Sequence, residues 1–276
     1  MYLNSASSKT INSYYSATNN SRDISYYEKQ HLNYLDKIMS NESVSLLITK
    51  DSEEFNAFKK CYSEDYLEKE TVLDINDQIR LFNKTHSFNN MNFVDWFALQ
   101  DYKHAGYVRI NQALRENVLS LRHYPAEIKQ LYLTLMHQTL LQSMEFKYEE
   151  IIYRGETRDI NFINMLSKGD TIKTKSFWSA SMNKETAQYF CEDVNELNPE
   201  QYNVFYFIEN KNPYSGANIS KILRDGEEEF LFLPNTEFNI VNTHRDEKNK
   251  TFNLLLETRP TTEYALTEKI HHIIFP

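Results

Sequence analysis

The chain has 276 residues, a formal net charge of -9 and only 5 glycines. The glycines are too widely spaced for either G-x-G-x-x-G or G-x-x-x-x-G-K, so the sequence excludes a Rossmann dinucleotide site and a P-loop. Because Asp and Glu outnumber Lys and Arg by 39 to 30, the chain lacks the strongly basic surface that drives non-specific nucleic-acid binding, and we expect no nucleic-acid partner.

The sequence also predicts neither a metal site nor a membrane span. The two cysteines, Cys61 and Cys191, cannot build a thiolate zinc site, and the 8 histidines lack metal-ligand spacing. We interpret Cys191 as a core residue, because it follows Tyr189 and Phe190 on the apolar face of a predicted helix. No apolar run approaches the ~18 residues of a membrane span, and the first ten residues lack the pattern of a secretory signal peptide.

The first half of the chain has a helical pattern. Residues 1–25 are rich in Ser, Asn, Thr and Tyr and are predicted to form a loosely ordered arm. An apolar stripe at helical spacing follows over residues 32–39. Further helices are predicted to begin near Ser52 and to cover Phe93–Gln100, Ala105–Leu121 and Ala126–Met144.

After Lys147 the apolar period changes from helical to strand-like. Strands are predicted over Glu150–Tyr153, Thr171–Phe177, Asn203–Ile208, Phe230–Leu233, Phe238–Asn242 and Phe252–Glu257, with a short helix over Lys184–Cys191. A helical half followed by a mainly antiparallel half predicts an α+β fold.

Arg154 and Gly155 stand at the end of a predicted strand. The guanidinium of Arg154 has a fixed fork of donors that suits a phosphate or carboxylate, and Gly155 would let a ligand approach the backbone closely. A surface ion pair beside a turn glycine explains the same two residues more simply. The residues alone leave both interpretations open.

Ser179-Ala180-Ser181 follows the apolar residues Phe177 and Trp178. On a strand, Ser179 and Ser181 point to the same face, where both hydroxyls can orient one partner on a facing strand. The alternative is a strand end that leads into a helix N-cap at Asn183.

Glu227-Glu228-Glu229 runs directly into the apolar residues 230–233. If a strand begins at Glu227, then Glu227 and Glu229 share one face and Glu228 points to the other. An acidic run is usually a solvated surface, but this one is fused to a strongly apolar segment. Paired carboxylates in a cleft can stabilise positive charge and activate an acceptor.

The order of Arg154, Ser179-x-Ser181 and Glu227-x-Glu229 before an apolar strand resembles the Arg-Ser-Glu class of mono-ADP-ribosyltransferases. Upstream, the chain is similar to the Y-x-x-I-N-x-x-L-R helix of the bacterial toxins of this family, through Tyr102-x-x-x-x-Tyr107-x-x-Ile110-Asn111-x-x-Leu114-Arg115. Ala180 departs from the family pattern, which more often has Thr at this position.

The resemblance covers roughly Phe93–Thr258 and implies a fold and domain boundaries. We expect a helical region packed on a mixed, mainly antiparallel β-sandwich of the ADP-ribosyltransferase type, in a domain over residues 91–276. This domain would have a helical part (91–147), a β core (148–258) and a C-terminal tail (259–276). Residues 1–90 are an N-terminal helical extension to which the sequence assigns no role.

The resemblance implies that NAD+ is the substrate, bound in a cleft between sheets. Arg154 would anchor a phosphate or ribose of NAD+, and the backbone of Gly155 would bind the nicotinamide amide. Asn111 and Arg115, one helical turn apart, would face the adenosine or phosphate side.

The same resemblance assigns the catalytic roles. Ser179 would hold Glu229, and Ser181 would support the strand that carries it. Glu229 would bind the 2'-hydroxyl of the nicotinamide ribose and stabilise the positive charge that develops as the glycosidic bond breaks.

Glu227 indicates the acceptor. Family members that modify arginine carry Glu at this position, whereas those that modify asparagine carry Gln, so the resemblance implies arginine. A guanidinium with a pKa above 12 needs a carboxylate that orients it and helps to take a proton. The segment Tyr214–Gly226 corresponds to the family's substrate-recognition turn, in which Tyr214 and Ile219 are expected to contact the acceptor.

Two other functions are compatible with these residues. One is an NAD+ glycohydrolase on the same fold, with water as the acceptor, and the other is a non-catalytic binding module. Most bacterial relatives act inside a target cell. The resemblance therefore implies an effector that is secreted into the host cytosol without a signal peptide, that acts as a monomer and that has a protein acceptor as its partner.

Overall fold

The computed structural model describes residues 47–85, 91–116, 125–143, 145–146 and 150–274, so the predicted arm and the apolar stripe at 32–39 lie outside the described residues. The helices are α3 (Glu53–Cys61), α4 (Glu64–Lys69), α5 (Ile75–Thr85), α6 (Phe93–Asp101), the π-helix η2 (Tyr102–Gly106), α7 (Tyr107–Arg115), α8 (Pro125–Ser143), α9 (Ile160–Asn164), α10 (Lys184–Gln188), α11 (Ser220–Leu223) and α12 (Glu263–Ile274). The strands are β1 (Ile151–Asp159), β2 (Thr171–Lys173), β3 (Trp178–Ser181), β4 (Gln201–Glu209), β5 (Gly216–Asn218), β6 (Glu229–Phe232), β7 (Glu237–Asp246) and β8 (Thr251–Thr258).

Serine caps define the first two described helices. The hydroxyl of Ser52 accepts a hydrogen bond from the backbone N of Phe55, and that of Ser63 accepts one from the backbone N of Tyr66, both at 3.2 Å. Acidic residues occupy the first turn of each helix, where they complement the helix dipole. The helix predicted to begin near Ser52 is therefore two helices, because Ser63 starts a new one.

One apolar core joins these helices to the rest of the molecule. It runs from Phe58 of α3 through Phe97 of α6 and Leu135 of α8 to Leu231 of β6. Phe58 is fully buried, and its ring centroid lies 5.0 Å from that of Phe93 and 4.9 Å from that of Phe97. The described part of the N-terminal extension thus shares its core with the main domain.

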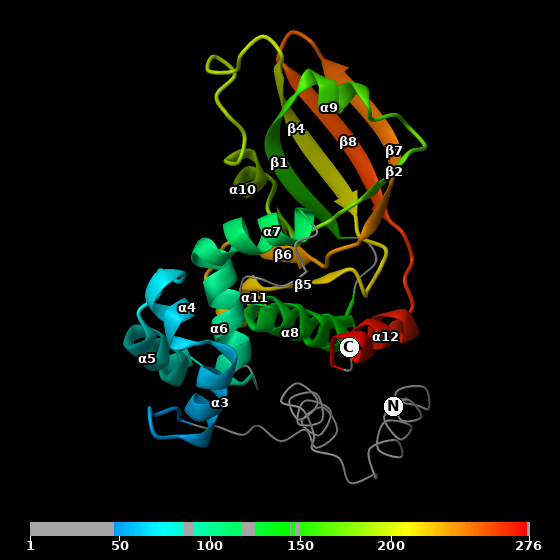
Figure 1. Cartoon of the computed structure of the whole chain (residues 1–276). Helices are drawn as coiled ribbons and strands as arrows, with labels where there is room; N and C mark the ends of the chain where they lie inside the picture. Colours follow the sequence, from blue (N-terminus) through cyan, green and yellow to red (C-terminus); the bar gives the residue numbers. More distant parts are fainter. Residues whose placement is uncertain (1–46, 86–90, 117–124, 144, 147–149, 275–276) are drawn as a thin grey trace.

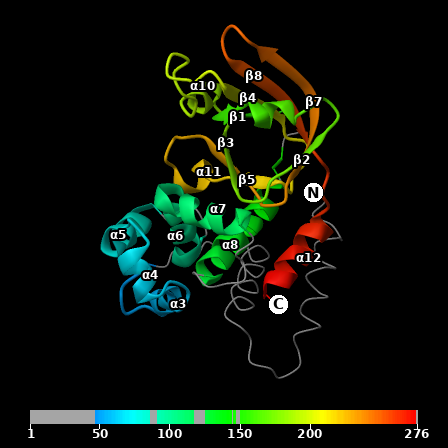
Figure 2. The ribbon, with the colours of Figure 1, turned by 45° about the horizontal axis from the view of Figure 1, so that its top comes forward.

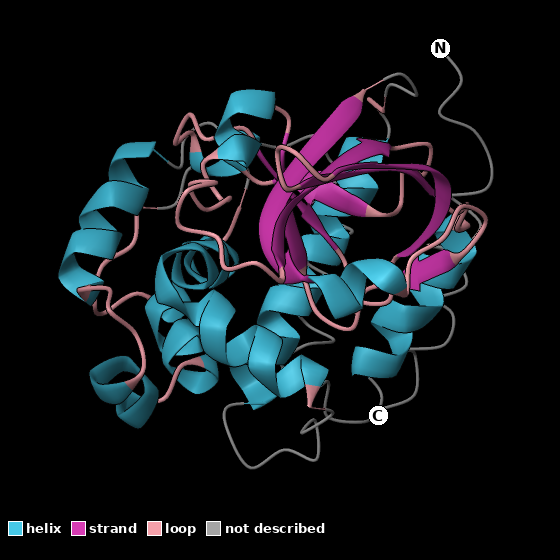
Figure 3. Ribbon diagram, turned by 90° about the horizontal axis from the view of Figure 1, so that it is seen from above, coloured by secondary structure: helices cyan, strands magenta, loops and turns pink. Residues whose placement is uncertain are grey.

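In the described part of the chain, eight strands form one sheet with the order β2-β7-β8-β4-β1-β3-β6-β5. All neighbours are antiparallel except β4 and β8, which confirms the predicted mixed, mainly antiparallel arrangement. Helices α6, α7 and α8 lie beside β5 and β6, with α3 to α5 beyond α6 (Figure 1), and the strands form one curved group with helices packed against it (Figure 3).

Several elements differ from the sequence prediction. The strand predicted over Thr171–Phe177 ends at Lys173, because the chain then crosses from β2 at one edge of the sheet to β3 between β1 and β6. β1 continues past Tyr153 to Asp159, since β4 pairs with it along its whole length. β5 and α11 were not predicted, and the predicted C-terminal tail contains α12, which packs alongside α8 (Figure 2).

The interpretation of Cys191 as a core residue is corrected. α10 ends at Gln188, so Tyr189 and Phe190 lie beyond the helix, and they are 87% and 69% exposed. Cys191 itself is only half-buried. Its partial burial raises the pKa of its thiol to about 11, which keeps it from acting as a thiolate at neutral pH.

Candidate active site

A cleft of about 980 Å³ opens between the η2 and α7 helices on one side and strands β1, β3 and β6 on the other. Its walls include all the residues that the sequence predicted to bind NAD+ or to act in catalysis: Asn111, Arg115, Arg154, Gly155, Ser179, Ser181, Glu227 and Glu229. Side chains from distant parts of the sequence therefore meet in one cavity.

Strands β3 and β6 bring Ser179 and Glu229 together. The hydroxyl of Ser179 donates a hydrogen bond of 2.6 Å to Oε1 of Glu229. The hydroxyl of Ser181 lies 3.5 Å from the backbone oxygen of Glu227 and accepts a 3.0 Å bond from the backbone N of Asn183. Asn183 also caps α10, so the strand-end alternative is observed, and of the two serines it is Ser179 that contacts the side chain of Glu229.

Glu229 is held on several sides inside the cleft. Its side chain is 12% exposed, and its backbone N donates a 2.8 Å hydrogen bond to the hydroxyl of Ser220. Burial raises the pKa of the Glu229 carboxyl above 4.5, while the hydrogen bond from Ser179 and the charge of Lys103 partly oppose this effect. The site therefore stabilises the carboxylate chiefly through these two neighbours.

The acidic triplet is a turn that leads into a strand. β6 begins at Glu229, and Glu228 has a φ of 54°, a left-handed conformation that side-chain-bearing residues adopt rarely. The exposed Glu228 contributes its backbone oxygen to a 2.8 Å hydrogen bond from the N of Met182. The side chain of Glu227, 60% exposed, lies at the rim of the cleft. Glu229, and not Glu228, is the carboxylate that faces Ser179.

Arg154 is fixed by contacts on three sides. One terminal nitrogen donates a 2.5 Å hydrogen bond to the backbone oxygen of Ser179, and the other lies 2.9 Å from Oε2 of Glu156. The guanidinium carbon lies 5.2 Å from the ring centroid of Trp178. The Nε of Arg154 is buried without a hydrogen-bond partner among the described residues.

Glu156 is the counter-ion of this arginine. Its carboxylate is 12% exposed and also accepts a 2.6 Å hydrogen bond from the hydroxyl of Tyr206. Burial alone would raise the pKa of Glu156, but the charges of Arg154 and Arg158 and the Tyr206 hydroxyl outweigh it and lower the pKa to about 2. The ion pair expected under the simpler interpretation thus exists, and it lies inside the cleft.

Gly155 is required by packing. A Cβ at this position would lie 2.2 Å from the backbone oxygen of Ala187 and 2.9 Å from the sulfur of Cys191. Any side chain here would push α10 away from β1. The side of Gly155 on which a Cβ would stand is thus filled by protein, which differs from the close ligand approach that the sequence suggested.

Asn111 and Arg115 lie on the helical wall. The amide Nδ2 of Asn111 donates a 3.0 Å hydrogen bond to the hydroxyl of Tyr102, whereas its Oδ1 is buried with no partner among the described residues. Tyr102 is buried beneath Phe177, with ring centroids 5.6 Å apart. Arg115 is exposed at the end of α7. The wall therefore offers an acceptor atom that lacks a partner among the described residues and, one helical turn away, an exposed cation.

Residues 11–259 match the model of a family described as NAD:arginine ADP-ribosyltransferase. The chain belongs to this family. NAD+ is accordingly its substrate, and the match includes most of the N-terminal region to which the sequence assigned no role. No curated protein sequence gives a significant match.

Solved structures with a similar fold are bacterial ADP-ribosyltransferases. Vis from Vibrio splendidus, in complex with agmatine, is 19% identical, with 81% of this chain and 92% of that chain covered and a TM-score of 0.48. Exoenzyme S from Pseudomonas aeruginosa is 16% identical, with 73% and 87% covered and a TM-score of 0.48. HopU1 of Pseudomonas syringae is 17% identical, with 72% and 86% covered and a TM-score of 0.46.

Of the three residues expected to bind an acceptor, Glu227 lines the cleft of this ADP-ribosyltransferase, whereas Ile219 and Tyr214 do not. The side chain of Ile219 is 0% exposed and belongs to the helical core. Tyr214 packs against the same core. Ile219 is an apolar residue directly before the short helix α11, and its side chain folds inward to complete the core. In this conformation its burial argues against a contact between its side chain and an acceptor.

Lys103 is a cleft residue that the sequence did not single out. Its ammonium forms an ion pair with Asp225 and lies 2.7 Å from Oε2 of Glu227 and 4.0 Å from Oε2 of Glu229. Its position directly after Tyr102 of the helical motif was the available signal. Glu156 could also have been found, since it lies two residues after Arg154 and so shares its face of the strand.

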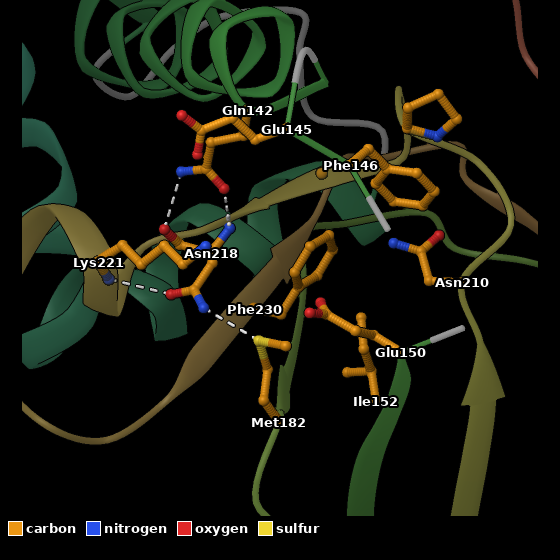
Figure 4. A pocket seen from close by; sticks show the side chains of 12 residues that line it. Gln142, Glu145, Phe146, Glu150, Ile152, Met182, Asn210, Asn218, Lys221 and Phe230 are labelled. Atoms are coloured by element: carbon orange, nitrogen blue, oxygen red, sulfur yellow. Dashed lines mark hydrogen bonds between the residues drawn. The ribbon is translucent and has the colours of Figure 1, made fainter. Parts of the chain in front are cut away.

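The loop between β5 and β6 is anchored at its first end by α8. Gln142 exchanges two hydrogen bonds with the backbone of Asn218, at 2.8 and 3.0 Å, and Oδ1 of Asn218 accepts a 3.0 Å bond from the backbone N of Lys221 (Figure 4). These contacts line a second, smaller pocket of about 210 Å³ on the other side of β6, beside Phe230. The loop thus starts from a fixed point.

The described residues show neither a metal-binding cluster nor a membrane-spanning helix. Within the described ranges, His, Cys, Asp and Glu side chains form no group of three or more that could hold a metal ion. Over the same part of the chain, no helix is both long and apolar enough to span a membrane.

Proposed function

We propose that this family member is a mono-ADP-ribosyltransferase that cleaves NAD+ between nicotinamide and ribose and transfers the ADP-ribose to an arginine side chain of a protein. The observation that carries the proposal is the meeting of Arg154, Ser179, Glu227 and Glu229 in one cleft. The family match supports the use of NAD+. The choice of arginine rests on Glu227.

The cleft suits a dinucleotide in size and in its unused polar atoms. Its volume of about 980 Å³ lies at the upper end of the range for small-molecule sites, roughly 300–1,000 Å³. Buried polar atoms normally have partners, yet Nε of Arg154 and Oδ1 of Asn111 have none among the described residues. We infer that Arg154 holds a phosphate or ribose of NAD+ and that Asn111 and Arg115 face its adenosine side.

Glu229 is proposed as the main catalytic residue. NAD+ supplies the glycosidic bond that breaks, and the carboxylate of Glu229 stabilises the positive charge that develops on the ribose. Ser179, 2.6 Å from Oε1, fixes the orientation of that carboxylate in advance. The effect is electrostatic preorganisation, since the carboxylate needs no rearrangement as the charge appears.

Glu227 is proposed to select and activate the acceptor. Its side chain is 60% exposed at the rim, where an incoming side chain can reach it. A guanidinium remains protonated at neutral pH and is a poor nucleophile, so a carboxylate must orient it and help to remove a proton.

The test is to incubate the protein with NAD+ and the small guanidino acceptor agmatine, and to compare Glu229→Gln and Glu227→Gln variants. Glu229→Gln should abolish NAD+ cleavage, because the neutral amide cannot stabilise the developing charge. Glu227→Gln should lose transfer to agmatine and keep some hydrolysis. Normal NAD+ cleavage by Glu229→Gln would refute the assignment.

Product analysis separates the transferase from a glycohydrolase. Free ADP-ribose as the sole product, even with agmatine or protein present, would establish hydrolysis. A calorimetric titration that detects no binding of NAD+ would establish a non-catalytic module. For the acceptor we propose a host protein, as for a bacterial effector secreted into host cytosol. Mass spectrometry of host lysate treated with the protein and NAD+ should find ADP-ribose on arginine.

A further inference from the structure

Lys103 reaches the carboxylates of Asp225, Glu227 and Glu229 from the helical side of the cleft. It lies on η2, and its side chain is only 12% exposed. From this π-helical turn its ammonium contacts Asp225, which lies 122 residues later in the sequence. The same ammonium lies 2.7 Å from Oε2 of Glu227 and 4.0 Å from Oε2 of Glu229.

These distances describe the position that the proposed acceptor must take. A guanidinium that Glu227 orients for attack beside Glu229 needs hydrogen-bond distance to Glu227 and a place close to Glu229. The ammonium of Lys103 already meets both conditions. Two cations cannot share a space within about 3 Å of one carboxylate oxygen without strong repulsion.

Asp225 is a second carboxylate that pairs with Lys103. Oδ1 of Asp225 accepts a 2.8 Å hydrogen bond from the Ser220 hydroxyl and a 3.0 Å bond from the backbone N of Glu227, so its carboxylate is fixed. Burial disfavours the charged form of Lys103, but its hydrogen bonds to Asp225 and Glu227 outweigh this and raise its pKa. Lys103 therefore stays an ammonium and is no nucleophile.

We propose that Lys103 occupies the position of the acceptor cation and that an acceptor guanidinium must displace it from Glu227 toward Asp225. This inference rests on the proposed function. It makes Lys103 a specificity-determining residue, because a guanidinium offers a planar fork that binds carboxylate oxygens in pairs, whereas a lysine acceptor offers only the point charge that Lys103 already supplies. Without an acceptor, Lys103 also keeps Glu227 paired and unable to activate water.

The experiment measures agmatine kinetics at saturating NAD+ for the wild-type protein, Lys103→Met and the matched control Lys221→Met. Lys221 is an exposed lysine of α11, between β5 and β6, so its removal changes the net charge by the same amount without opening the acceptor position. We expect the KM for agmatine to fall about fivefold in Lys103→Met, the equivalent of about 1 kcal/mol for one ion pair. Hydrolysis without agmatine should rise, and Lys221→Met should resemble the wild type.

Butylammonium provides an independent readout. Added to Lys103→Met it should enter the vacated position and compete with agmatine, restoring the wild-type KM, whereas it should have little effect on the wild-type protein. A merely structural role of Lys103 would not produce this rescue. Thermal unfolding should show that Lys103→Met is folded, and Lys103→Gln serves as the second variant.

The outcomes separate this inference from the proposed function. An unchanged or raised KM for agmatine in Lys103→Met or Lys103→Gln, with a lower kcat, would refute the proposal that Lys103 occupies the acceptor position. It would show that Lys103 only positions the loop. Absence of NAD+ cleavage by the wild-type protein would instead refute the proposed function.

Discussion

Arg154 and Glu156 lie on one face of β1 and form an ion pair inside the cleft, with 2.9 Å between a guanidinium nitrogen and Oε2. Positions i and i+2 of a strand share a face, so the pairing follows from the sequence spacing alone. From β4, the hydroxyl of Tyr206 donates a hydrogen bond to the carboxylate of Glu156. Glu156 thereby fixes the arginine that we propose to hold NAD+, which makes it a positioning residue.

This pair should make the stability of the protein depend on pH. The pKa of Glu156 is lowered from 4.5 to about 2, so its stabilisation is complete above pH 4.5 and is lost as the pH falls toward 2. Between pH 5 and pH 3 the wild-type protein should lose about 2 kcal/mol more unfolding free energy than Glu156→Gln. Urea unfolding at both pH values measures this difference.

The surface variant Glu200→Gln serves as the control for Glu156→Gln. It should follow the wild-type pH dependence, since Glu200 is exposed. If Glu156→Gln and the wild-type protein lose stability in parallel, the ion pair does not set the acid response.

The hydrogen bond from Ser179 to Glu229 predicts a change in the pH profile of NAD+ cleavage. Because burial raises the pKa of Glu229 and Ser179 opposes that rise, activity should increase with pH through a value above 4.5. Ser179→Ala should move this acid limb further upward and lower kcat/KM by roughly 10- to 100-fold, the effect of one hydrogen bond to a charged group.

Ser181→Ala is the matched control for Ser179→Ala. Within the described residues, its hydroxyl contacts backbone atoms of Glu227 and Asn183 and no carboxylate, so its removal should leave the acid limb in place. An acid limb that also stays in place in Ser179→Ala would show that the serine does not tune the pKa of Glu229.

The sequence predicted which residues meet in the cleft better than it predicted the loop between β5 and β6. Arg154, Ser179 and Glu229 were identifiable because each stands in a short motif beside a strand, and strand alternation fixes the direction of each side chain. The only local signal for Lys103 is its position directly after Tyr102, and its partner Asp225 is distant in sequence. The burial of Ile219 was not predictable for the same reason, because it depends on a core built from residues that are distant in sequence.

The sequence also predicted the boundaries of some helices and strands better than others. The helices α6 and α8 were predicted within one or two residues, because both are rich in apolar residues. β5 has only the residues Gly216–Asn218 and becomes a strand by pairing with β6. A Cβ at Gly216 would lie 2.2 Å from the backbone oxygen of Leu231, so this strand depends on tertiary contact and not on propensity.

Gly155→Ala should destabilise the protein and displace α10. The added Cβ would come within 2.2 Å of the Ala187 backbone oxygen, and a backbone atom cannot move aside as a flexible side chain can. We expect a loss of about 1–3 kcal/mol in unfolding free energy, with a raised KM for NAD+ because α10 borders the cleft.

Gly169→Ala separates packing from backbone strain. Gly169 has a φ of +95° and no atom within 4 Å of an added Cβ, so its substitution costs only conformational strain. It should reduce stability without changing the KM for NAD+. An equal KM change in both variants would mean that contact with Ala187 is not the cause.

The described N-terminal helices should support the cleft through Arg109. Its guanidinium lies 2.6 Å from Oδ2 of Asp101, donates a 3.2 Å hydrogen bond to the backbone oxygen of Glu70, and stacks 4.8 Å from the ring centroid of Tyr66. Asp101 is 2% exposed, directly precedes η2 and also accepts a hydrogen bond from Tyr66. These contacts tie α4 to the turn that presents Lys103.

Arg109→Met should therefore be strongly destabilising, by about 3–5 kcal/mol, because it leaves the buried carboxyl of Asp101 without its counter-charge. Burial already raises the pKa of Asp101 to about 6, so the loss should shrink at pH 5, where the acid becomes neutral. The double variant Asp101→Asn with Arg109→Met should recover part of the stability in urea unfolding at pH 7, since no buried charge then remains. A loss below about 1 kcal/mol in Arg109→Met would show instead that the N-terminal helices are held by their apolar core alone.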